Sequence, residues 1–561
     1  MALSTDAYRA LEDIVGPKYI SQDPAVMDSY SYQWLAETVR PNQSKFMPRP
    51  EAALLPGSTK EVQAIVRICN KYKIKVKPYS TGWYFYGAPQ SEGVIQLDMR
   101  RMDHILEIDE KNMFAVIEPY AIAGVVQAEV MKRGLNCTVT GAGASCSTLV
   151  GATCYHGSSG TSIYTGELRE NLLGAEWVMP NGEILRTGSL GSGCGWFCAE
   201  GPGPSMRGIV RGALGARGGL GVYTKCAVKL SPWPGPTEFP VEGTVPAYRS
   251  PLPENFRAYT VAFKDWDSLF ESYYRLYDNE IAYYAHRQWT MLGADLGPAF
   301  WMLYQDPTKS LDDIEEFVRK RDVKQVTEEM RHSYQLVLVG MSQRDIEYKE
   351  KVLEQILKET GGWKVKKWLE PEMEQFSLLY LLRLGKKNLN FVYTGGWIGN
   401  YMQAGTPDFT NKYEPLAEDT TEKFQSKGLL VDCGSDSMMG CVGSIGGGGQ
   451  CGLEQFGFYD VADKKSTAAA IEWMKYCIQE EARHNIPPGK EGMFLAVGKT
   501  HREFQQDLAK QAAIHIWQRK IKQAVDPNNL GDRMYPTLDE SQNKADRLFV
   551  SESPSKDLSE V

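Results

Sequence analysis

The sequence predicts an α+β protein with more than one domain. Two observations lead to this prediction: residues 46–233 alternate short strand patterns with helices and glycine-rich loops, and longer helical patterns mixed with strands follow from residue 234. The chain has 561 residues, 42% of them hydrophobic, which is enough apolar material for several cores. We therefore expect an N-terminal part of residues 1–45, a first domain of residues 46–233, a second of residues 234–480, a C-terminal segment of residues 481–537 that returns to the first domain, and a polar tail of residues 538–561.

The charge and the apolar pattern of the chain exclude two classes of protein. A formal net charge of −8 provides no basic field for nucleic acid or anionic lipid. No apolar run reaches the roughly 18 residues of a membrane span, and residues 1–20 lack a basic segment followed by an apolar one. We expect a cytoplasmic protein with no nucleic-acid partner and no membrane span, unless it docks on a membrane partner.

The elements of the first domain follow from local patterns. Residues 1–45 are predicted to be mostly helical, and the apolar stretch 52–55 predicts a strand that ends at Pro56. Ser58 and Glu61 have the spacing of a helix N-cap, and apolar residues at helical spacing continue that helix for about 15 residues. Residues 75–79 alternate as a strand that runs directly into a loop. Further along the chain we expect strands at residues 93–98, 113–118, 176–179, 183–186 and 334–340, a strand ending at residue 230, and helices at residues 122–133, 206–213, 311–321, 349–359, 466–481 and 503–525.

The loop that begins at Ser80 offers hydroxyls and backbone N–H groups. Ser80-Thr81-Gly82-Trp83 follows a predicted strand, which is an arrangement that suits a pyrophosphate bound without a metal ion. No GxGxxG follows the first strand and no GxxxxGK[ST] occurs, so the two commonest nucleotide motifs are absent. Taken alone, the loop is also compatible with an ordinary glycine-containing turn.

Seven short motifs in a fixed order resemble the FAD-binding domain of the vanillyl-alcohol oxidase and p-cresol methylhydroxylase family. The resemblance covers about residues 50–232 and depends on the order and spacing of the motifs. They are Pro56-Gly57-Ser58-Thr59-Lys60-Glu61-Val62, Pro78-x-Ser80-Thr81-Gly82, Leu97-Asp98-Met99, Val116-x-Glu118-Pro119, Gly151-x-x-x-x-His156-Gly157, Pro180-Asn181-Gly182-Glu183-Ile184 and Gly219-x-Gly221-Val222-x-Thr224.

The resemblance implies two subdomains that cradle FAD and an α+β cap domain over the isoalloxazine ring. Residues 80–87 would form the pyrophosphate loop, residues 141–157 would pass along the flavin, and residues 221–222 would meet the adenine side. The cofactor-binding residues implied in this way are Tyr79, Ser80, Thr81, Gly82, Trp83, Gly141, Gly143, Ser145, Cys146, Gly151, Ala152, His156, Gly157, Gly221 and Val222.

Three residues are candidate catalytic residues on the same resemblance. Tyr86 stands where the family's phenol oxidases hold the substrate phenolate with a tyrosine. His156 matches a Thr-His-Gly element of the sugar-lactone oxidoreductases, and we expect it to handle the flavin or a proton, unless it only hydrogen-bonds within its loop. Glu491 lies in residues 489–496, which occupy the place of the family's Tyr-Arg pair but lack that pair.

The sequence departs from the family at its covalent and metal sites. Residues 80–87 contain no histidine, and Gln450-Cys451 stand where an attachment histidine would be expected, so we expect noncovalent FAD, with Cys451 as the alternative attachment point. The seven histidines have no two-His metal spacing, and we expect no metal. Eleven scattered cysteines without a CxxC pair predict mostly reduced core thiols. Arg287 and Arg383 could bind a carboxylate or phenolate, although isolated arginines of this kind are usually surface residues.

The function implied is an FAD-dependent oxidoreductase that transfers a hydride from an aromatic or other alcohol-type small molecule to flavin N5. One alternative is a sugar or hydroxy-acid dehydrogenase that passes electrons to a protein partner. A third is a flavin subunit that relays electrons within a larger complex. We also expect a homo-oligomer.

Overall fold

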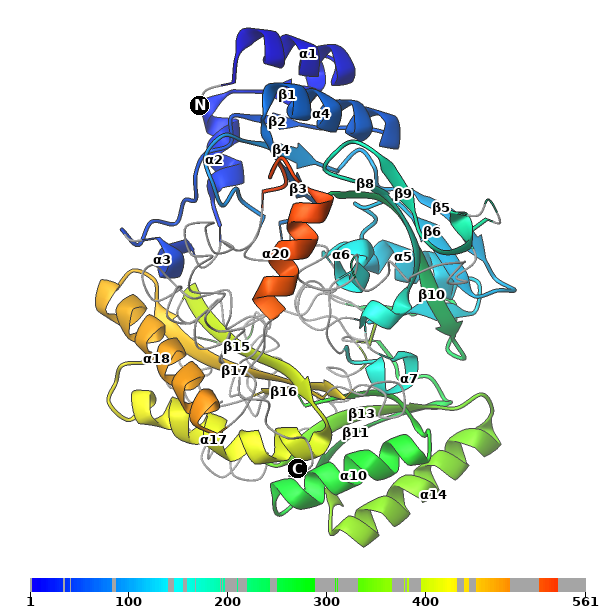
Figure 1. The fold of residues 1–561 in the computed structure, drawn as a ribbon. Coiled ribbons are helices and arrows are strands. Elements are labelled where there is room, and N and C mark those ends of the chain that lie inside the picture. The colour runs from blue at the N-terminus through cyan, green and yellow to red at the C-terminus, as the bar shows by residue number, and fades with distance from the viewer. Residues whose placement is uncertain are drawn as a thin grey trace, which may run out of the picture.

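The computed structural model describes most of the chain and arranges the described residues in three β-sheets with helices packed against them (Figure 1). The described segments are residues 3–33, 36–40, 42–82, 87–139, 146–154, 159–166, 168–191, 219–242, 250–287, 331–365, 395–430, 438–442, 451–484 and 514–532, with a few single residues between them.

The first sheet has four strands in the order β1-β2-β4-β3, and β2, β4 and β3 run parallel. Its helix α4 begins where the sequence predicts, because the Ser58 side chain accepts a hydrogen bond from the Glu61 N–H and the Glu61 carboxylate accepts one from Gly57 N–H. The apolar faces of α1 and α4 share one core with these strands. The elements are α1 (Thr5–Val15), β1 (Ile20–Ser21), α2 (Pro24–Ser31), α3 (Ala36–Val39), β2 (Ala52–Leu54), α4 (Thr59–Tyr72), β3 (Lys75–Tyr79) and β4 (Val94–Asp98).

The second sheet is antiparallel, with the strand order β5-β6-β10-β8-β9 and β7 paired to β10. The predicted hairpin forms between β8 and β9, with Gly182 at a φ of +83° in its turn. The patterns missed β5, most of whose side chains are exposed or half-buried. The elements are β5 (Ile105–Asp109), β6 (Phe114–Ile117), α5 (Ala123–Met131), β7 (Leu135–Cys137), α6 (Leu149–Cys154), α7 (Ser162–Thr165), β8 (Leu172–Val178), β9 (Ile184–Arg186) and β10 (Val222–Pro232).

The third sheet has seven strands in the order β14-β11-β13-β12-β16-β17-β15 and is covered by α10, α14 and α17 on one face (Figure 1). Alternation along β13 explains why all of it is buried. Tyr334, Leu336 and Leu338 join the core under those helices, whereas Val337 and Val339 join a second core that includes Met131 of α5. The elements are β11 (Phe256–Ala262), α10 (Trp266–Asp278), β12 (Ala282–His286), β13 (Ser333–Val339), α14 (Gln343–Thr360), β14 (Trp363–Lys364), β15 (Gly395–Gly405), α17 (Pro407–Gln425), β16 (Met438–Val442), β17 (Cys451–Asp460) and α18 (Lys464–Arg483).

The C-terminal helix α20 (Ile514–Val525) lies beside the first two sheets (Figure 1). Ile521 and Val525 pack against the core of the second sheet. The chain then pairs with β3 of the first sheet, where Val76 bridges Gly531 in parallel. The helices predicted at residues 206–213 and 311–321 lie outside the described residues. No helix in the described part of the chain has the length and apolar character to cross a membrane.

Candidate cofactor-binding site

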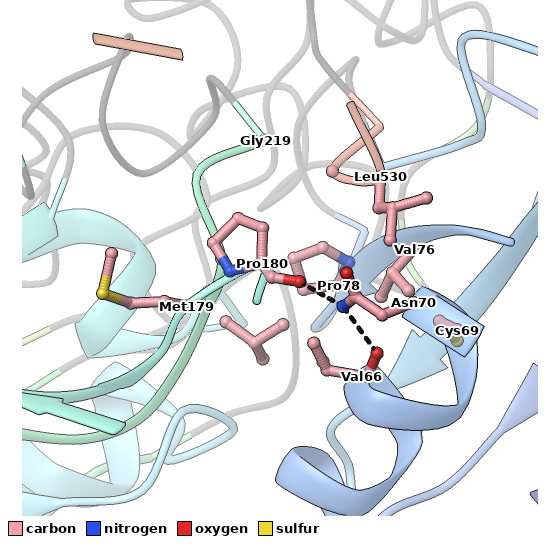
Figure 2. A pocket seen from close by; sticks show the side chains of 12 residues that line it. Val66, Cys69, Asn70, Val76, Pro78, Met179, Pro180, Gly219 and Leu530 are labelled. Atoms are coloured by element: carbon pink, nitrogen blue, oxygen red, sulfur yellow. Dashed lines mark hydrogen bonds between the residues drawn. The ribbon is translucent and has the colours of Figure 1, made fainter. Parts of the chain in front are cut away.

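A crevice of about 330 Å³, its open mouth included, lies between the first and second sheets (Figure 2). Helix α4 and strand β3 form one wall, the β8–β9 turn and the start of β10 form the second, and the C-terminal segment forms the third. Most of the lining side chains are apolar, which favours an uncharged group as the occupant. The lining residues are Val66, Cys69, Asn70, Val76, Pro78, Met179, Pro180, Gly219, Gly221, Val222, Leu530 and Gly531.

The Asn70 side chain ties the walls of the crevice together. Its Nδ2 donates to the Val66 carbonyl at 2.9 Å and to the Pro180 carbonyl at 2.6 Å, as Figure 2 shows. Its Oδ1 accepts a hydrogen bond from Asn528 Nδ2 at 3.0 Å. One amide therefore links the first sheet's helix, the hairpin of the second sheet and the C-terminal segment.

Gly221 and Val222, two of the predicted cofactor-binding residues, line this crevice. Gly221 has a φ of +136°, and a Cβ atom there would lie 2.9 Å from Cε2 of Trp177 and against the Val178 carbonyl. Glycine at this position is therefore required by the packing of the protein itself. Val222 pairs with Val178 in the second sheet, which fixes the wall at this point.

The loop after β3 is supported by the Tyr79 ring. Gly82 has a φ of +66°, and a Cβ atom there would lie 2.7 Å from Tyr79 Cζ; at Gly87 it would lie 2.8 Å from Tyr79 Cε2. Tyr79 packs edge-to-face on Tyr30 at 5.3 Å, and burial raises the pKa of its phenol. The Tyr79 ring thus contacts both described ends of the predicted pyrophosphate loop, at Gly82 and at Gly87. Ser80 and Thr81 belong to the first of these ends.

The described part of the second predicted stretch is helix α6, which carries Gly151 and Ala152. Cys146 precedes the helix and is exposed, whereas Cys154 at its end is buried with Sγ 3.9 Å from Sγ of Cys226. Burial, with the neighbouring thiol, raises the pKa of Cys226, so this pair has little thiolate character. Among the cysteines whose side chains the structure describes, five are buried, which confirms the expectation of core thiols for those five: Cys69, Cys137, Cys154, Cys226 and Cys477.

A cluster of buried hydroxyl groups joins residues 138–139 to residues 159–161. These two segments flank the stretch that is predicted to pass the flavin. Thr138 Oγ1 lies 3.0 Å from Ser159 Oγ, and Thr161 Oγ1 accepts a hydrogen bond from Val139 N–H at 2.9 Å. The adjoining Gly160 carbonyl accepts a hydrogen bond from Ala285 N–H of β12 at 2.9 Å. This cluster therefore couples the second sheet to the third.

The remaining predicted site residues lie outside the described residues, and their assignment stays a prediction. They are Trp83, Tyr86, Gly141, Gly143, Ser145, His156, Gly157 and Glu491, together with Gln450 and Arg383.

Arg287 corrects one expectation, because its side chain is buried and not on the surface. Its guanidinium donates to the Arg331 carbonyl at 2.7 Å, lies 4.6 Å from the Trp266 ring centroid and lies 3.8 Å from Glu414 Oε1. Groups of the protein itself thus surround this charge, so Arg287 is not a candidate for substrate binding.

The sequence patterns missed Asn70, Leu530 and Gly531 as parts of the site. Asn70 reads as an ordinary polar residue on α4. The only available signal for the other two was the turn-forming run that follows Asp526-Pro527.

Comparison with known proteins identifies the cofactor domain. Residues 50–188 match the family model described as an FAD binding domain. The chain is 27% identical over 233 residues to glycolate oxidase subunit GlcD of Bacillus subtilis (strain 168), which covers 41% of this chain and 46% of that protein. It is 31% identical over 192 residues to the 4-cresol dehydrogenase [hydroxylating] flavoprotein subunit of Pseudomonas putida, covering 33% of this chain and 36% of that protein. The matches thus span less than half the length of these curated relatives.

The fold is similar to a solved structure over almost the whole chain. The crystal structure of p-cresol methylhydroxylase with substrate bound superposes with a TM-score of 0.70 at 20% identity, covering 96% of this chain and 97% of that one. At this identity the similarity establishes the architecture, including the third sheet beyond the cofactor domain.

Proposed function

We propose that the chain is an FAD-dependent oxidoreductase of the vanillyl-alcohol oxidase and p-cresol methylhydroxylase family, which the matched FAD binding domain, the similarity to the 4-cresol dehydrogenase flavoprotein subunit and the shared architecture support. Its substrate would be a small aromatic or other alcohol-type molecule. The observation that carries this proposal is the crevice in which Pro78, at the start of the predicted pyrophosphate loop, meets Gly221 and Val222.

The residues of the crevice fit the adenosine end of FAD. Val76, Met179 and Val222 offer apolar surface to a flat ring, and no carboxylate lines the crevice among the described residues. At Gly219 a Cβ atom would lie 2.6 Å from the Gly531 carbonyl oxygen, so the walls can approach each other only because both residues are glycines. Residues 80–82, which lead away from Pro78, would then receive the pyrophosphate on backbone N–H groups and hydroxyls.

The side chains of this protein would supply orientation and proton handling. When bound, FAD supplies the hydride acceptor at its N5 atom. We propose that Tyr86 binds the substrate oxygen, that His156 interacts with the flavin or moves a proton, and that Glu491 acts in the same site. The buried hydroxyl cluster around Thr138 and Ser159 fixes the described chain that flanks the stretch carrying His156.

We propose further that the FAD is held noncovalently, because residues 80–87 contain no histidine. We propose in addition that the protein is a cytoplasmic homo-oligomer that acts on a small molecule. Its electron acceptor would be oxygen, a quinone or a protein. A specific alternative is a hydroxy-acid dehydrogenase that passes electrons to a protein partner, and the similarity to glycolate oxidase subunit GlcD favours the hydroxy-acid substrate of this alternative.

Two measurements on the purified protein test this function. A visible spectrum before and after acid precipitation reports the flavin, and we expect yellow colour that moves to the supernatant. Colour in the pellet would show covalent FAD instead. Anaerobic mixing with 4-alkylphenols, aryl alcohols, 2-hydroxy acids and sugar alcohols should then bleach the flavin with one class. A flavoprotein that no small molecule bleaches would be an electron-relay subunit, and a protein that binds no flavin would overturn the proposal.

A further inference from the structure

The Lys522 ammonium group lies between the two glycines that narrow the cofactor crevice. The residue is 5% exposed, at the end of α20, and its three N–H bonds have three acceptors. Lys522 Nζ donates to the Gly219 carbonyl at 2.5 Å, to the Gly531 carbonyl at 2.9 Å and to Asp526 Oδ2 at 2.6 Å. Two of these acceptors belong to residues that line the crevice.

The position of the cation has an electrostatic reason. Gly219 and Gly531 come from segments more than 300 residues apart, yet their backbones touch: a Cβ atom on Gly531 would lie 2.6 Å from the carbonyl carbon of Gly219. Two carbonyl oxygens directed to one buried point repel each other, because their dipoles bring partial negative charges together in a medium of low polarity. A cation between them turns that repulsion into two charge-assisted hydrogen bonds.

The Asp526 carboxylate neutralises the charge of Lys522 and connects the pair to the residues that follow in the chain. Besides pairing with Lys522, its carboxylate accepts hydrogen bonds from Leu530 N–H at 2.9 Å and Gly531 N–H at 2.8 Å. Leu530 and Gly531 are the crevice-lining residues of the C-terminal segment. The shape of the third wall therefore depends on the Lys522–Asp526 pair.

A second, separate anchor holds the same segment to the first sheet. The Leu530 carbonyl accepts from Val76 N–H at 2.8 Å, and Asp532 N–H donates to the Val76 carbonyl at 2.9 Å. The Asp532 carboxylate lies 3.5 Å from Lys77 Nζ and accepts a hydrogen bond from Gln90 N–H at 2.8 Å. These bonds involve no group of Lys522, so the segment stays attached when the lysine is changed.

We propose that Lys522 is a positioning residue for FAD, and that the C-terminal segment of residues 526–532 is a wall of the crevice on which the affinity for FAD depends. The inference rests on the proposed function and deepens it. Lys522 acts through the Gly219 and Gly531 backbones, and it does not line the crevice itself.

The test compares FAD affinity with stability in two variants. Lys522→Met combined with Asp526→Asn removes both charges, which avoids leaving one buried and unpaired. Lys349→Met combined with Asp345→Asn is the matched control, because Lys349 also donates to a backbone carbonyl, that of Val339 at 2.8 Å, and pairs with an aspartate one helical turn away at 3.1 Å, but lies in the third-sheet domain and not at the crevice. For each apoprotein the Kd of added FAD is measured by flavin fluorescence quenching, and the melting temperature is measured without FAD.

We expect the Lys522→Met, Asp526→Asn double variant to raise the Kd for FAD about tenfold or more, because it loses two hydrogen bonds from a charged donor. The Lys349→Met, Asp345→Asn control should lower the melting temperature yet keep the Kd within about twofold. A Lys522→Met, Asp526→Asn variant that binds FAD as tightly as the parent would overturn the inference alone. A parent that binds no FAD would overturn the proposed function, and with it this inference.

Hydrogen exchange of the parent protein gives a second readout that needs no variant. Added FAD should slow the exchange of the amides of residues 530–532, since an occupied crevice disfavours the opening of its third wall. Exchange that is unchanged by FAD at these amides, although FAD binds, would contradict a role of this segment in the site even if the double variant failed to fold.

Discussion

Gly160, in the segment between the predicted flavin stretch and α7, lies directly against the ring of Tyr284 in the third sheet. A Cβ atom on Gly160 would lie 2.6 Å from Tyr284 Cδ2 and 2.7 Å from Cζ. The neighbouring bond from Ala285 N–H to the Gly160 carbonyl fixes the approach at 2.9 Å. The contact of Gly160 with the Tyr284 ring and the adjoining backbone hydrogen bond together set how the third sheet sits on the cofactor domain.

Gly160→Ala should therefore destabilise the protein by about 1–3 kcal/mol, because a fully buried tyrosine ring has to move to admit the methyl group. Denaturant unfolding measures this loss. Gly174→Ala is the control, since a Cβ there has its nearest neighbour at 3.6 Å, an ordinary contact. Equal stabilities of the two variants would show that Tyr284 yields without strain.

Gly82→Ala should lower the FAD content of the purified protein. The methyl group would collide with the Tyr79 ring, which supports both described ends of the predicted pyrophosphate loop. Gly93→Ala separates this collision from the backbone effect, because Gly93 also has a positive φ, of +75°, but no atom lies within 4 Å of its Cβ position. Both variants should lose roughly 1 kcal/mol of stability from the left-handed backbone. Only Gly82→Ala should lose flavin, and full flavin content in it would remove this loop from the cofactor site.

Asn70→Ala should weaken FAD binding as well as folding. The variant loses the hydrogen bonds that tie α4 to the Pro180 carbonyl and to Asn528 across the crevice, which we expect to reduce stability by about 1–2 kcal/mol. Gln63→Ala is the control: Gln63 donates to the Gly182 carbonyl of the same hairpin at 2.8 Å but does not line the crevice. Fluorescence titration with FAD should show a higher Kd for Asn70→Ala alone. Equal Kd values in the two variants would limit Asn70 to a structural role.

Two histidines should make the free energy of unfolding change with pH in opposite directions between about pH 5 and pH 8, where histidine titrates. Burial, with the charge of Arg331, lowers the pKa of His332, so the folded state binds its proton less readily than the unfolded state. Its contribution is fully present above the unfolded pKa and is lost as the pH falls below it. The Glu118 carboxylate raises the pKa of the exposed His104, whose smaller contribution is present at low pH and is lost as the pH rises.

Urea unfolding at a series of pH values measures these slopes. His332→Gln should flatten the loss of stability on acidification, while His104→Gln should make that loss slightly steeper. A His332→Gln variant with the parent's pH dependence would show that this ring titrates alike in the folded and unfolded chain.

Local signals predicted the fold better than they predicted the walls of the crevice. The start of α4 follows from Ser58 and Glu61, which lie three residues apart. The Ser58 side chain accepts a hydrogen bond from Glu61 N–H, and the Glu61 carboxylate accepts one from the N–H of Gly57, the residue before Ser58. The crevice instead depends on Gly219 meeting Gly531, and neither residue carries information about a partner 312 positions away. In the same way Arg287 reads as a surface cation, because only the folded third sheet reveals Trp266 and Glu414 around it.

The most direct test of the proposed substrate chemistry is Tyr86→Phe. The variant keeps the ring and loses only the hydroxyl, which we propose binds a substrate oxygen that is charged or gains charge during turnover. A hydrogen bond of that kind contributes roughly 1.5–3 kcal/mol, so kcat/KM should fall about ten- to hundredfold while FAD content stays unchanged. Tyr84→Phe removes a hydroxyl two residues earlier in the same loop and should leave kcat/KM near the parent value. Rapid-mixing measurements of flavin reduction decide the matter: an unchanged rate in Tyr86→Phe would limit Tyr86 to packing, and a loss of FAD would assign it to the cofactor and not to the substrate.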